Sequence, residues 1–453
     1  MPVDLIIIGG GPAGYLGAER AAQAGHSVLL FEKRALGGVC LNEGCMPTKT
    51  LLHSAKLYEN AMHGKAYGVI AQAVSIDHAA VIERKNKVVR TLVAGVNAKM
   101  KKQGVTVIKE AAKIIKKTEE GFAVSAGGQI YEAGKLLIAT GSEAIIPPIP
   151  GIMEGLVSGF VMTSREILDK KELPRRLLVI GGGIIGLEMA AYFAAVGVQV
   201  TVVEMLGKIA GNADGEIAER LLNALKEKGV DFQLGSRVTE IFTDGIAYEK
   251  EGQQKRLDAD AILLCIGRCA PEESLGLEAI GVETERGFIA TDQHLQTNIP
   301  HVYAAGDCNG KSMLAHTAYR EAEVAVNHML GKADSMCYGA IPSVIYTSPE
   351  VACVGETEES AREKGLEFIV KKLSMRFAGR FIAENDRADG LCKLLVETGS
   401  RHLIGAHLIG GYASEIIYGA AMMIESQKPV EDLQKIIFPH PTVGEIIRES
   451  LFL

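Results

Sequence analysis

The sequence lacks the features that mark membrane, secreted and nucleic-acid-binding proteins. No uncharged run is both long and apolar enough to span a bilayer, because runs such as 177–187 are interrupted too early. Eight cysteines in 453 residues are too few for a secreted disulfide scaffold. A net charge of −7 argues against nucleic acid as a main partner. We therefore expect a globular protein without a signal peptide, located in the cytoplasm, or in the mitochondrial matrix if it is a processed form.

The chain is rich in glycine. It has 51 glycines among 453 residues, which exceeds the usual share of about 7% and indicates many tight turns. A chain of 453 residues is also too long for one hydrophobic core. Residues 4–32 read as strand, glycine turn, helix and strand, and residues 176–204 repeat that order. We further expect a long helical excursion over 50–110, short strands over 106–139, a linker at 147–151 and a separate C-terminal domain from about 338.

Each repeat carries the glycine pattern of a dinucleotide-binding turn. Gly9, Gly11 and Gly14 stand between strand and helix, and Glu32 follows at the end of the second strand. The first glycine makes the turn, the second lets backbone approach a pyrophosphate, and the third lets helix pack on strand. A plain glycine turn is the alternative for an isolated pattern, but the strand, helix and acidic residue in register favour a nucleotide site. The second repeat supplies the same set: Gly181, Gly183, Gly186 and Glu204.

Two such sites in one chain suggest two dinucleotides, one a tightly held flavin and the other an exchangeable nicotinamide. Glu204 bears on the choice of nicotinamide, because a carboxylate there bonds the 2′-hydroxyl of NAD and repels the 2′-phosphate of NADP. Residues 205–207 contain no basic side chain, and Lys208 is the only one nearby. The sequence therefore predicts NAD.

A cysteine pair follows the first glycine pattern. Cys40 and Cys45 lie in a segment, 37–49, that is rich in glycine. Residues five positions apart in a regular helix are separated by about 8–9 Å at Cα, whereas a disulfide tolerates at most about 7 Å. The pair can bridge only if the turn is distorted, and a helix beginning near Cys45 would favour its thiolate. The alternative is two ordinary buried cysteines. Beside a nucleotide site, a dithiol indicates electron transfer between nucleotide and sulfur.

One histidine suits proton transfer from a thiol. His440 stands between Pro439 and Pro441, which fix its backbone, and Glu445 follows at short range. A rigid histidine beside a carboxylate has the orienting arrangement of a catalytic triad. The alternative is a surface histidine in a proline turn.

These motifs together resemble the pyridine nucleotide–disulfide oxidoreductase family over essentially the whole chain. Within it, Leu41-Asn42 and Pro47-Thr48-Lys49 resemble the lipoamide branch, whereas the glutathione branch usually reads Val-Asn and Pro-Lys-Lys. The resemblance implies an α/β fold with two Rossmann-like dinucleotide-binding domains plus an α+β C-terminal dimerisation domain. The implied domains are an FAD-binding domain at 1–147, an NAD-binding domain at 148–270, a return to the FAD/central domain at 271–337 and the C-terminal dimerisation (interface) domain at 338–453.

The resemblance also implies roles at matching positions. Cys40 becomes the interchange thiol that meets the substrate, and Cys45 the thiol against the flavin. His440 becomes the base, oriented by Glu445, and serves the other subunit of a homodimer. The implied cofactor contacts are Lys49 near the flavin ring and paired with Glu188, Asp307 at the ribityl and phosphate region, Ala315 at the ring, Ala112 and Val238 at the two adenines, and Thr140, Gly141 and Gly267 at strand ends.

The implied reaction is flavin-dependent oxidation of protein-bound dihydrolipoamide to lipoamide, with reduction of NAD to NADH through a Cys40–Cys45 disulfide. The implied partner is a lipoyl-bearing protein, either a 2-oxoacid dehydrogenase acyltransferase or the glycine-cleavage carrier. Three other functions stay open: a glutathione-like or other NAD(P)H-dependent disulfide reductase, a transhydrogenase or diaphorase, and a non-catalytic flavoprotein scaffold of a multienzyme complex.

Two positions depart from the family pattern. Gly444 stands where serine is common, which we expect to loosen the loop between His440 and Glu445. Cys269 replaces a usually basic residue and could be an extra reactive thiol or a tolerated loop substitution. Cys265 and Cys269 predict no metal site, because no second pair or histidine cluster accompanies them.

Overall fold

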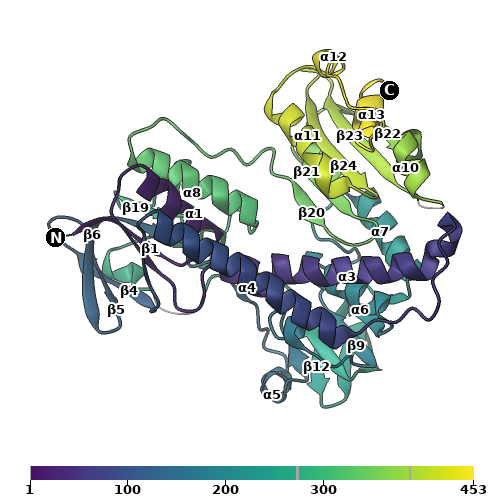
Figure 1. The fold of residues 1–453 in the computed structure, drawn as a ribbon, viewed down its shortest axis with the longest axis horizontal. Helices are drawn as coiled ribbons and strands as arrows, with labels where there is room; N and C mark the ends of the chain where they lie inside the picture. Colours follow the sequence, from purple (N-terminus) through teal and green to yellow (C-terminus); the bar gives the residue numbers. More distant parts are fainter. Residues whose placement is uncertain (1, 272–274, 387–388) are drawn as a thin grey trace. The chain divides into compact units, whose positions relative to one another are not determined.

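The computed structural model describes residues 2–271, 275–386 and 389–453. The chain divides into two compact units, each assembled from segments that are distant in sequence (Figure 1). Unit 1 comprises Met1–Thr50, Glu83–Ile145 and Gly267–Cys337, and unit 2 comprises Leu51–Ile82, Ile146–Ile266 and Tyr338–Leu453. Within the described ranges, no helix is long and apolar enough to cross a membrane.

Unit 1 is built on a mainly parallel sheet of order β3-β2-β1-β6, which β5 and β4 extend in antiparallel fashion and β19 extends through β6. Residues Leu5 to Ile7 of β1 are at most 1% exposed, as is typical of a parallel strand covered on both faces. Helices α1 and α8 pack against each other (Figure 1). The elements of unit 1 are β1 (Val3–Ile8), α1 (Pro12–Gln23), β2 (Val28–Phe31), α2 (Gly38–Glu43), β3 (Thr106–Ile108), β4 (Ala112–Lys117), β5 (Phe122–Ala126), β6 (Gln129–Ile138), β7 (Glu143–Ala144), β16 (Arg268–Cys269), β17 (Thr284–Glu285), β18 (Phe288–Ile289), β19 (Val302–Ala304) and α8 (Ala315–Met329).

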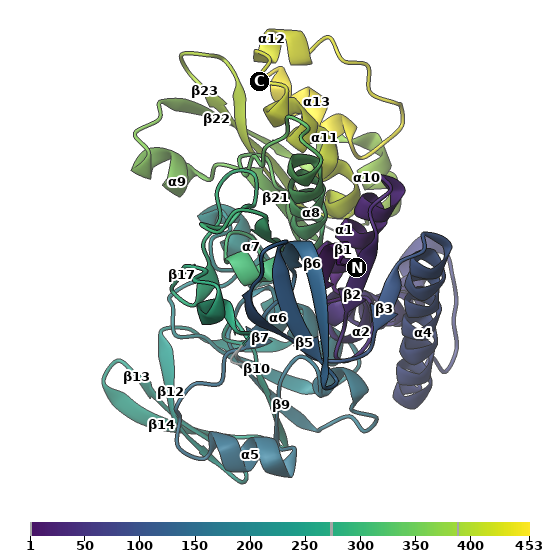
Figure 2. The same ribbon diagram turned by 90° about the vertical axis from the view of Figure 1, so that its left-hand side faces the viewer.

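Unit 2 begins with a second parallel sheet, of order β11-β10-β9-β15-β8. Its β9-α6-β10 segment repeats the β1-α1-β2 segment of unit 1, so the predicted internal duplication is confirmed. A separate three-stranded sheet, β12-β13-β14, follows with α5 beside it (Figure 2). The elements are α5 (Ile152–Ser158), β8 (Val161–Met162), β9 (Arg176–Ile180), α6 (Ile184–Ala195), β10 (Gln199–Val203), α7 (Gly215–Glu227), β11 (Val230–Gln233), β12 (Ser236–Phe242), β13 (Gly245–Lys250), β14 (Gln253–Asp258) and β15 (Ala261–Leu264).

The C-terminal part of unit 2 is a five-stranded antiparallel sheet of order β20-β21-β24-β23-β22. Helices α11 and α13 contact the sheet and contribute to its apolar core. The predicted fold class, two Rossmann-like parts plus an α+β C-terminal part, is therefore confirmed. The elements are β20 (Ser343–Ile345), β21 (Val351–Gly355), α9 (Glu358–Glu363), β22 (Phe368–Ser374), α10 (Gly379–Glu384), β23 (Leu391–Glu397), β24 (Leu403–Ile409), α11 (Ala413–Glu425), α12 (Val430–Leu433) and α13 (Glu445–Leu451).

The predicted helical excursion consists of two α-helices. Helix α3 (Cys45–His63) starts five residues earlier than expected, and α4 (His78–Lys102) ends before the first predicted strand. The residues between them form no α-helix in the described structure. The expected strands over 106–139 are confirmed as β3 to β6.

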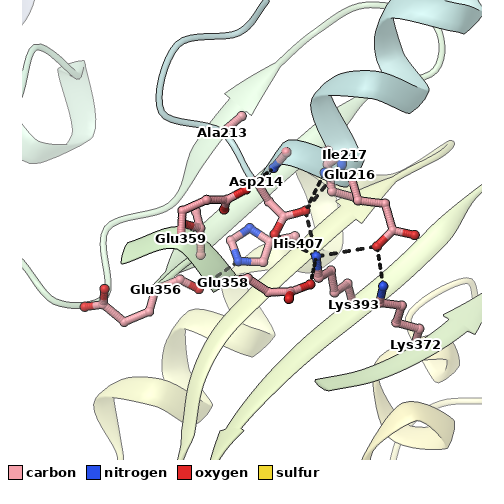
Figure 3. A network of polar contacts seen from close by, with 12 residues as sticks. Ala213, Asp214, Glu216, Ile217, Glu356, Glu358, Glu359, Lys372, Lys393 and His407 are labelled. Carbon is pink, nitrogen blue, oxygen red and sulfur yellow. Dashed lines mark hydrogen bonds and ion pairs between the residues drawn. The ribbon is translucent and has the colours of Figure 1, made fainter. Parts of the chain in front are cut away.

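A row of polar side chains crosses the C-terminal sheet. Cys353, His407, Lys393 and Lys372 are register partners on four adjacent strands. Lys393 is 2% exposed, and its Nζ lies 2.8 Å from Oδ2 of Asp214, which caps the N-terminus of α7. The same ammonium lies 2.5 Å from Glu358 and 3.4 Å from Glu216 (Figure 3). This buried network ties the C-terminal sheet to the second parallel sheet's α7.

Candidate active site

Two helices meet at the cysteine pair. Cys40 lies in α2 and Cys45 is the first residue of α3, and Gly44 between them has φ −147° and ψ −105°, which interrupts the helix. The turn thus has the distortion that a Cys40–Cys45 bridge would need, and the expected helix start at Cys45 is confirmed. Both residues are free thiols in the structure. The positive end of the dipole of this 19-residue helix therefore lies at Cys45, a position that favours a thiolate.

The two thiols are in hydrogen-bond contact. This contact and, next, burial raise the pKa of the Cys40 thiol, while the nearby charge of Lys49 opposes them. Asp307 also lies close enough for its charge to raise that pKa. Unit 1 thus brings Cys40, Cys45, Lys49 and Asp307 into one electrostatic neighbourhood, although these residues come from separate parts of the sequence.

The redox turn packs directly on the first glycine turn. A Cβ at Gly38 would lie 2.6 Å from Cα of Gly11, so only a residue without a side chain allows this approach. Gly9 and Gly181, the first glycines of the two patterns, have φ of +107° and +110°, which L side chains rarely adopt. Dithiol and dinucleotide turn are therefore neighbours in the fold.

Both dinucleotide turns fit a pyrophosphate. Helices α1 and α6 are each 12 residues long and begin after Gly11 and Gly183, and no side chain of the described chain caps either N-terminus. A Cβ at Gly183 would meet no described atom within 4 Å, so the backbone there is open to a ligand. Uncapped N–H groups at a helix N-terminus are an anion site. The residues present thus fit the two dinucleotides expected from the sequence.

The acidic residue of each repeat braces its own turn. Glu32 accepts hydrogen bonds from the N–H groups of Gly10 at 2.8 Å and Arg34 at 2.7 Å. Glu204 accepts from Gly182 at 2.6 Å and Leu206 at 2.7 Å. The sequence indicated only a ribose contact for these carboxylates, which stays a prediction. The two βαβ repeats therefore share these hydrogen bonds as well as their order of elements.

A bridge that the sequence did not reveal joins three loop ends of unit 1. Ser142 donates to Oδ2 of Asp307 at 2.5 Å, and Arg268 donates to Oγ of Ser142 at 2.6 Å and to its carbonyl at 2.6 Å. Thr140 and Gly141 precede Ser142, and Gly267 precedes Arg268. The sequence contained one signal for this bridge: Ser142 and Arg268 each follow a strand that ends in a glycine. The bridge fixes Asp307 in place.

His440 is oriented by Glu445 in unit 2. Nδ1 of His440 lies 2.9 Å from Oε1 of Glu445, and the N–H of Thr442 donates to Oε2 at 2.8 Å. The Thr442 bond, and then His440, hold the pKa of Glu445 below its ordinary value. Because an ionised carboxylate only accepts, Nδ1 carries the proton and Nε2 is left as the base. The imidazole is 78% exposed in the single chain.

The remaining predicted residues lie at element ends or in helices. Glu188, in α6, accepts from the N–H of Tyr346 at 2.9 Å. Ala315 opens α8, Ala112 opens β4 and Val238 lies in β12. The ligand contacts predicted for these residues stay predictions. Cys269 lies in β16 with its thiol 3.8 Å from the Glu143 carbonyl. In the described ranges no three potential ligands are grouped to hold a metal.

Gly444→Ser is expected to stabilise the His440 loop by about 0.5–1 kcal/mol. Gly444 has φ −60° and ψ −21°, and an added Cβ would lie 3.7 Å from its nearest neighbours. Nothing in this geometry needs glycine, so a side chain only restricts the unfolded chain. Urea titration of both proteins measures the change. Gly410→Ser is the control, since Gly410 has φ +151° and the same change there should destabilise. Equal destabilisation by both would contradict the loop geometry.

Comparisons with known proteins show which family the chain resembles along its length. Residues 3–322 match the family described as "Pyridine nucleotide-disulphide oxidoreductase", and residues 341–451 match its dimerisation domain. The chain is 37% identical to mitochondrial dihydrolipoyl dehydrogenase of Pisum sativum, covering 99% of this chain and 90% of that one. It is 37% identical to dihydrolipoyl dehydrogenase of Bacillus subtilis, covering 99% and 98%. The HOCl-induced flavoprotein disulfide reductase RclA of Escherichia coli is similar in structure, with TM-score 0.87, 30% identity and 99% coverage of both chains.

Proposed function

Because the chain belongs to the pyridine nucleotide-disulphide oxidoreductase family, we propose that it oxidises protein-bound dihydrolipoamide to lipoamide and reduces NAD to NADH. The observation that carries the proposal is that the turn holding the Cys40–Cys45 thiol pair packs on the first dinucleotide turn, with Gly38 against Gly11. The lipoamide branch is supported by the names of relatives 37% identical over 99% of this chain. Glu204 and the lack of a basic side chain at 205–207 support NAD.

The chain's residues carry the sulfur chemistry. Nε2 of His440 accepts a proton from one substrate thiol, and the resulting thiolate attacks Sγ of Cys40 in the oxidised pair. The Cys40–Cys45 bond breaks, a mixed disulfide forms, and Cys45 leaves as a thiolate. The second substrate sulfur then displaces Cys40 and closes the lipoamide ring, so two electrons have passed from substrate to the cysteine pair. Bound FAD supplies the redox relay from this dithiol to NAD.

The same family supports our proposals for assembly and location. The match to the dimerisation domain indicates a homodimer. We propose that His440 serves the active site of the partner subunit, which accords with its 78% exposure in the single chain. The lipoyl arm belongs to a 2-oxoacid dehydrogenase acyltransferase or to the glycine-cleavage carrier. The proposed location is the cytoplasm, or the mitochondrial matrix for a processed form.

A second candidate function is reduction of another disulfide. It is favoured by the likeness to RclA, a flavoprotein disulfide reductase. The two functions differ in the disulfide that reoxidises the reduced cysteine pair: lipoamide for the first and another disulfide for the second. One experiment can therefore separate them. A diaphorase or a non-catalytic scaffold requires that the cysteine pair be uncoupled from the nucleotide.

Anaerobic titration of the purified holoprotein with NADH is expected to consume two electrons per subunit and to produce a long-wavelength absorbance band. That band arises when a thiolate lies against the flavin, so it reports the coupling of Cys45. Reoxidation by lipoamide, and not by glutathione disulfide, would identify the substrate. Bleaching without the band would favour a diaphorase, and no reduction by NADH would favour a scaffold. Preferential reoxidation by glutathione disulfide would favour the second candidate.

A further inference from the structure

A cavity in unit 2 lies beside the second dinucleotide turn. Its volume is about 370 Å³, within the range of about 300–1,000 Å³ that is usual for small-molecule sites. All of its lining residues belong to unit 2. Gly183 and Ile184, where α6 begins, form one part of the wall. Gly211 and Asn212 also line the cavity and are exposed, so it is open to solvent on that side.

The C-terminal sheet and the segments joined to it supply most of the remaining wall. Aliphatic side chains give this part an apolar surface: Ile341, Ile345, Val351 and Val354. Cys353 of β21 and His407 of β24 are register partners, and both line the cavity. Cross-strand partners project from the same face of a sheet, so a thiol and an imidazole are neighbours in an otherwise largely apolar wall.

His407 holds a hydrogen-bond acceptor that the described chain leaves unpaired. The residue is 0% exposed, and its Nε2 lies 2.8 Å from the carbonyl oxygen of Glu356. Because a carbonyl oxygen only accepts, Nε2 carries a proton, and burial holds the pKa of the imidazole below its ordinary value. Nδ1 of the neutral ring is therefore a bare acceptor, and no described residue donates to it. Figure 3 shows this nitrogen turned away from Glu356, on the side of Ala213, which also lines the cavity.

The neighbouring carboxylate cannot supply the missing donor. Asp214 is near enough for its charge to act on the imidazole, but an ionised carboxylate only accepts hydrogen bonds. It accepts them from Nζ of Lys393 at 2.8 and 2.9 Å and from the N–H groups of Glu216 and Ile217. A buried acceptor without a donor is costly, so a ligand that brings an N–H or O–H group to Nδ1 gains free energy on binding.

We propose that this cavity binds a small neutral molecule that has an apolar body and one N–H or O–H group, which donates to Nδ1 of His407. The aliphatic wall favours an apolar body and makes a charged ligand costly. The inference goes beyond the proposed function, because the site uses neither the thiol pair nor FAD. Its wall includes Gly183 and Ile184, so the ligand lies beside the second dinucleotide turn.

Calorimetric titration of the FAD-loaded protein with indole and with benzofuran, in the absence of nicotinamide, tests the site. The two probes have the same bicyclic shape, but only indole carries an N–H group. Indole is expected to bind about tenfold more tightly, which is the effect of one hydrogen bond to a buried acceptor. Binding of neither probe would show that the cavity holds water only. That result, or equal binding of both probes, would overturn the inference.

His407→Phe should abolish the preference for indole, because phenylalanine keeps a ring and removes the lone pair. His402→Phe is the matched control, since His402 precedes the same strand but does not line the cavity, and the preference should survive there. Ala213→Leu fills the cavity and should weaken both probes by about tenfold or more, which keeps the test decisive if His407→Phe does not fold.

Two results with these variants would overturn the inference: a preference for indole that persists in His407→Phe, or undiminished binding in Ala213→Leu. A third concerns the dinucleotide. If His407→Phe weakened NADH binding as much as indole binding, the cavity would belong to the dinucleotide site. Because the probes are titrated without nicotinamide or lipoamide, failure of the proposed function would leave their expected binding unchanged, so the two failures are distinguishable.

Discussion

Cys45→Ser is expected to abolish dihydrolipoamide turnover, by about 10³-fold or more, while leaving FAD bound. Serine cannot form a disulfide with Cys40, so the acceptor of the substrate's electrons disappears. The fold should tolerate the change, because Cys45 is the first residue of α3 and serine is favourable at a helix N-terminus. Steady-state turnover with NAD and the flavin-to-protein absorbance ratio measure the two effects.

Cys269→Ser is the control for that experiment. Cys269 is another thiol of unit 1, but it lies in β16, with its thiol contacting the Glu143 carbonyl. Turnover should survive its replacement. Loss of FAD from Cys45→Ser would show that Cys45 is structural rather than chemical, and substantial residual turnover would show that electrons reach the flavin without it.

The nucleotide turns and the redox turn were predictable because they are local. Strand, glycine turn, helix and acidic residue follow one another within about thirty positions, and the backbone geometry that each glycine permits is a property of its own turn. The structure reproduces this in both repeats, down to the carboxylates of Glu32 and Glu204 on the N–H groups of Gly10 and Gly182. The cysteine spacing likewise indicated that a bridge between Cys40 and Cys45 needs a distorted turn, and the helix is interrupted at Gly44 between them.

Contacts between distant segments were not predictable in this way. Tyr15 and Tyr319 read as ordinary helix residues, and their contact depends on how α1 packs on α8. Ser142 and Arg268 are 126 positions apart. Lys393 interrupts the apolar strand β23, where a single sequence suggests an exposed lysine. Its burial depends on carboxylates from α7 and α9, which only the tertiary fold brings there.

Lys393→Met is expected to lower the free energy of unfolding by about 3–5 kcal/mol, because it leaves buried carboxylates without their counter-ion. Asp214 is 0% exposed and Lys393 2% exposed. Asp214 would retain only its capping bonds from the N–H groups of Glu216 at 3.2 Å and Ile217 at 3.3 Å. Urea titration measures the loss. Lys435→Met is the control, because Lys435 is 75% exposed beside Asp432 and its removal should leave the free energy of unfolding almost unchanged.

The pH dependence identifies the charge pair as the cause of that loss. Burial opposes ionisation of Asp214, but the bond and charge of Lys393, the charge of His407 and the N–H of Ile217 together outweigh it and hold the pKa below its ordinary value. Burial likewise opposes the charge of Lys393, yet Asp214 and Glu358 raise its pKa. The stabilisation is therefore complete between about pH 4 and pH 10, lost as pH falls through the folded-state pKa of Asp214 and lost as pH rises through that of Lys393. The difference in free energy of unfolding between wild type and Lys393→Met should therefore shrink toward both pH limits. A difference caused by altered packing alone would stay constant across the same pH range.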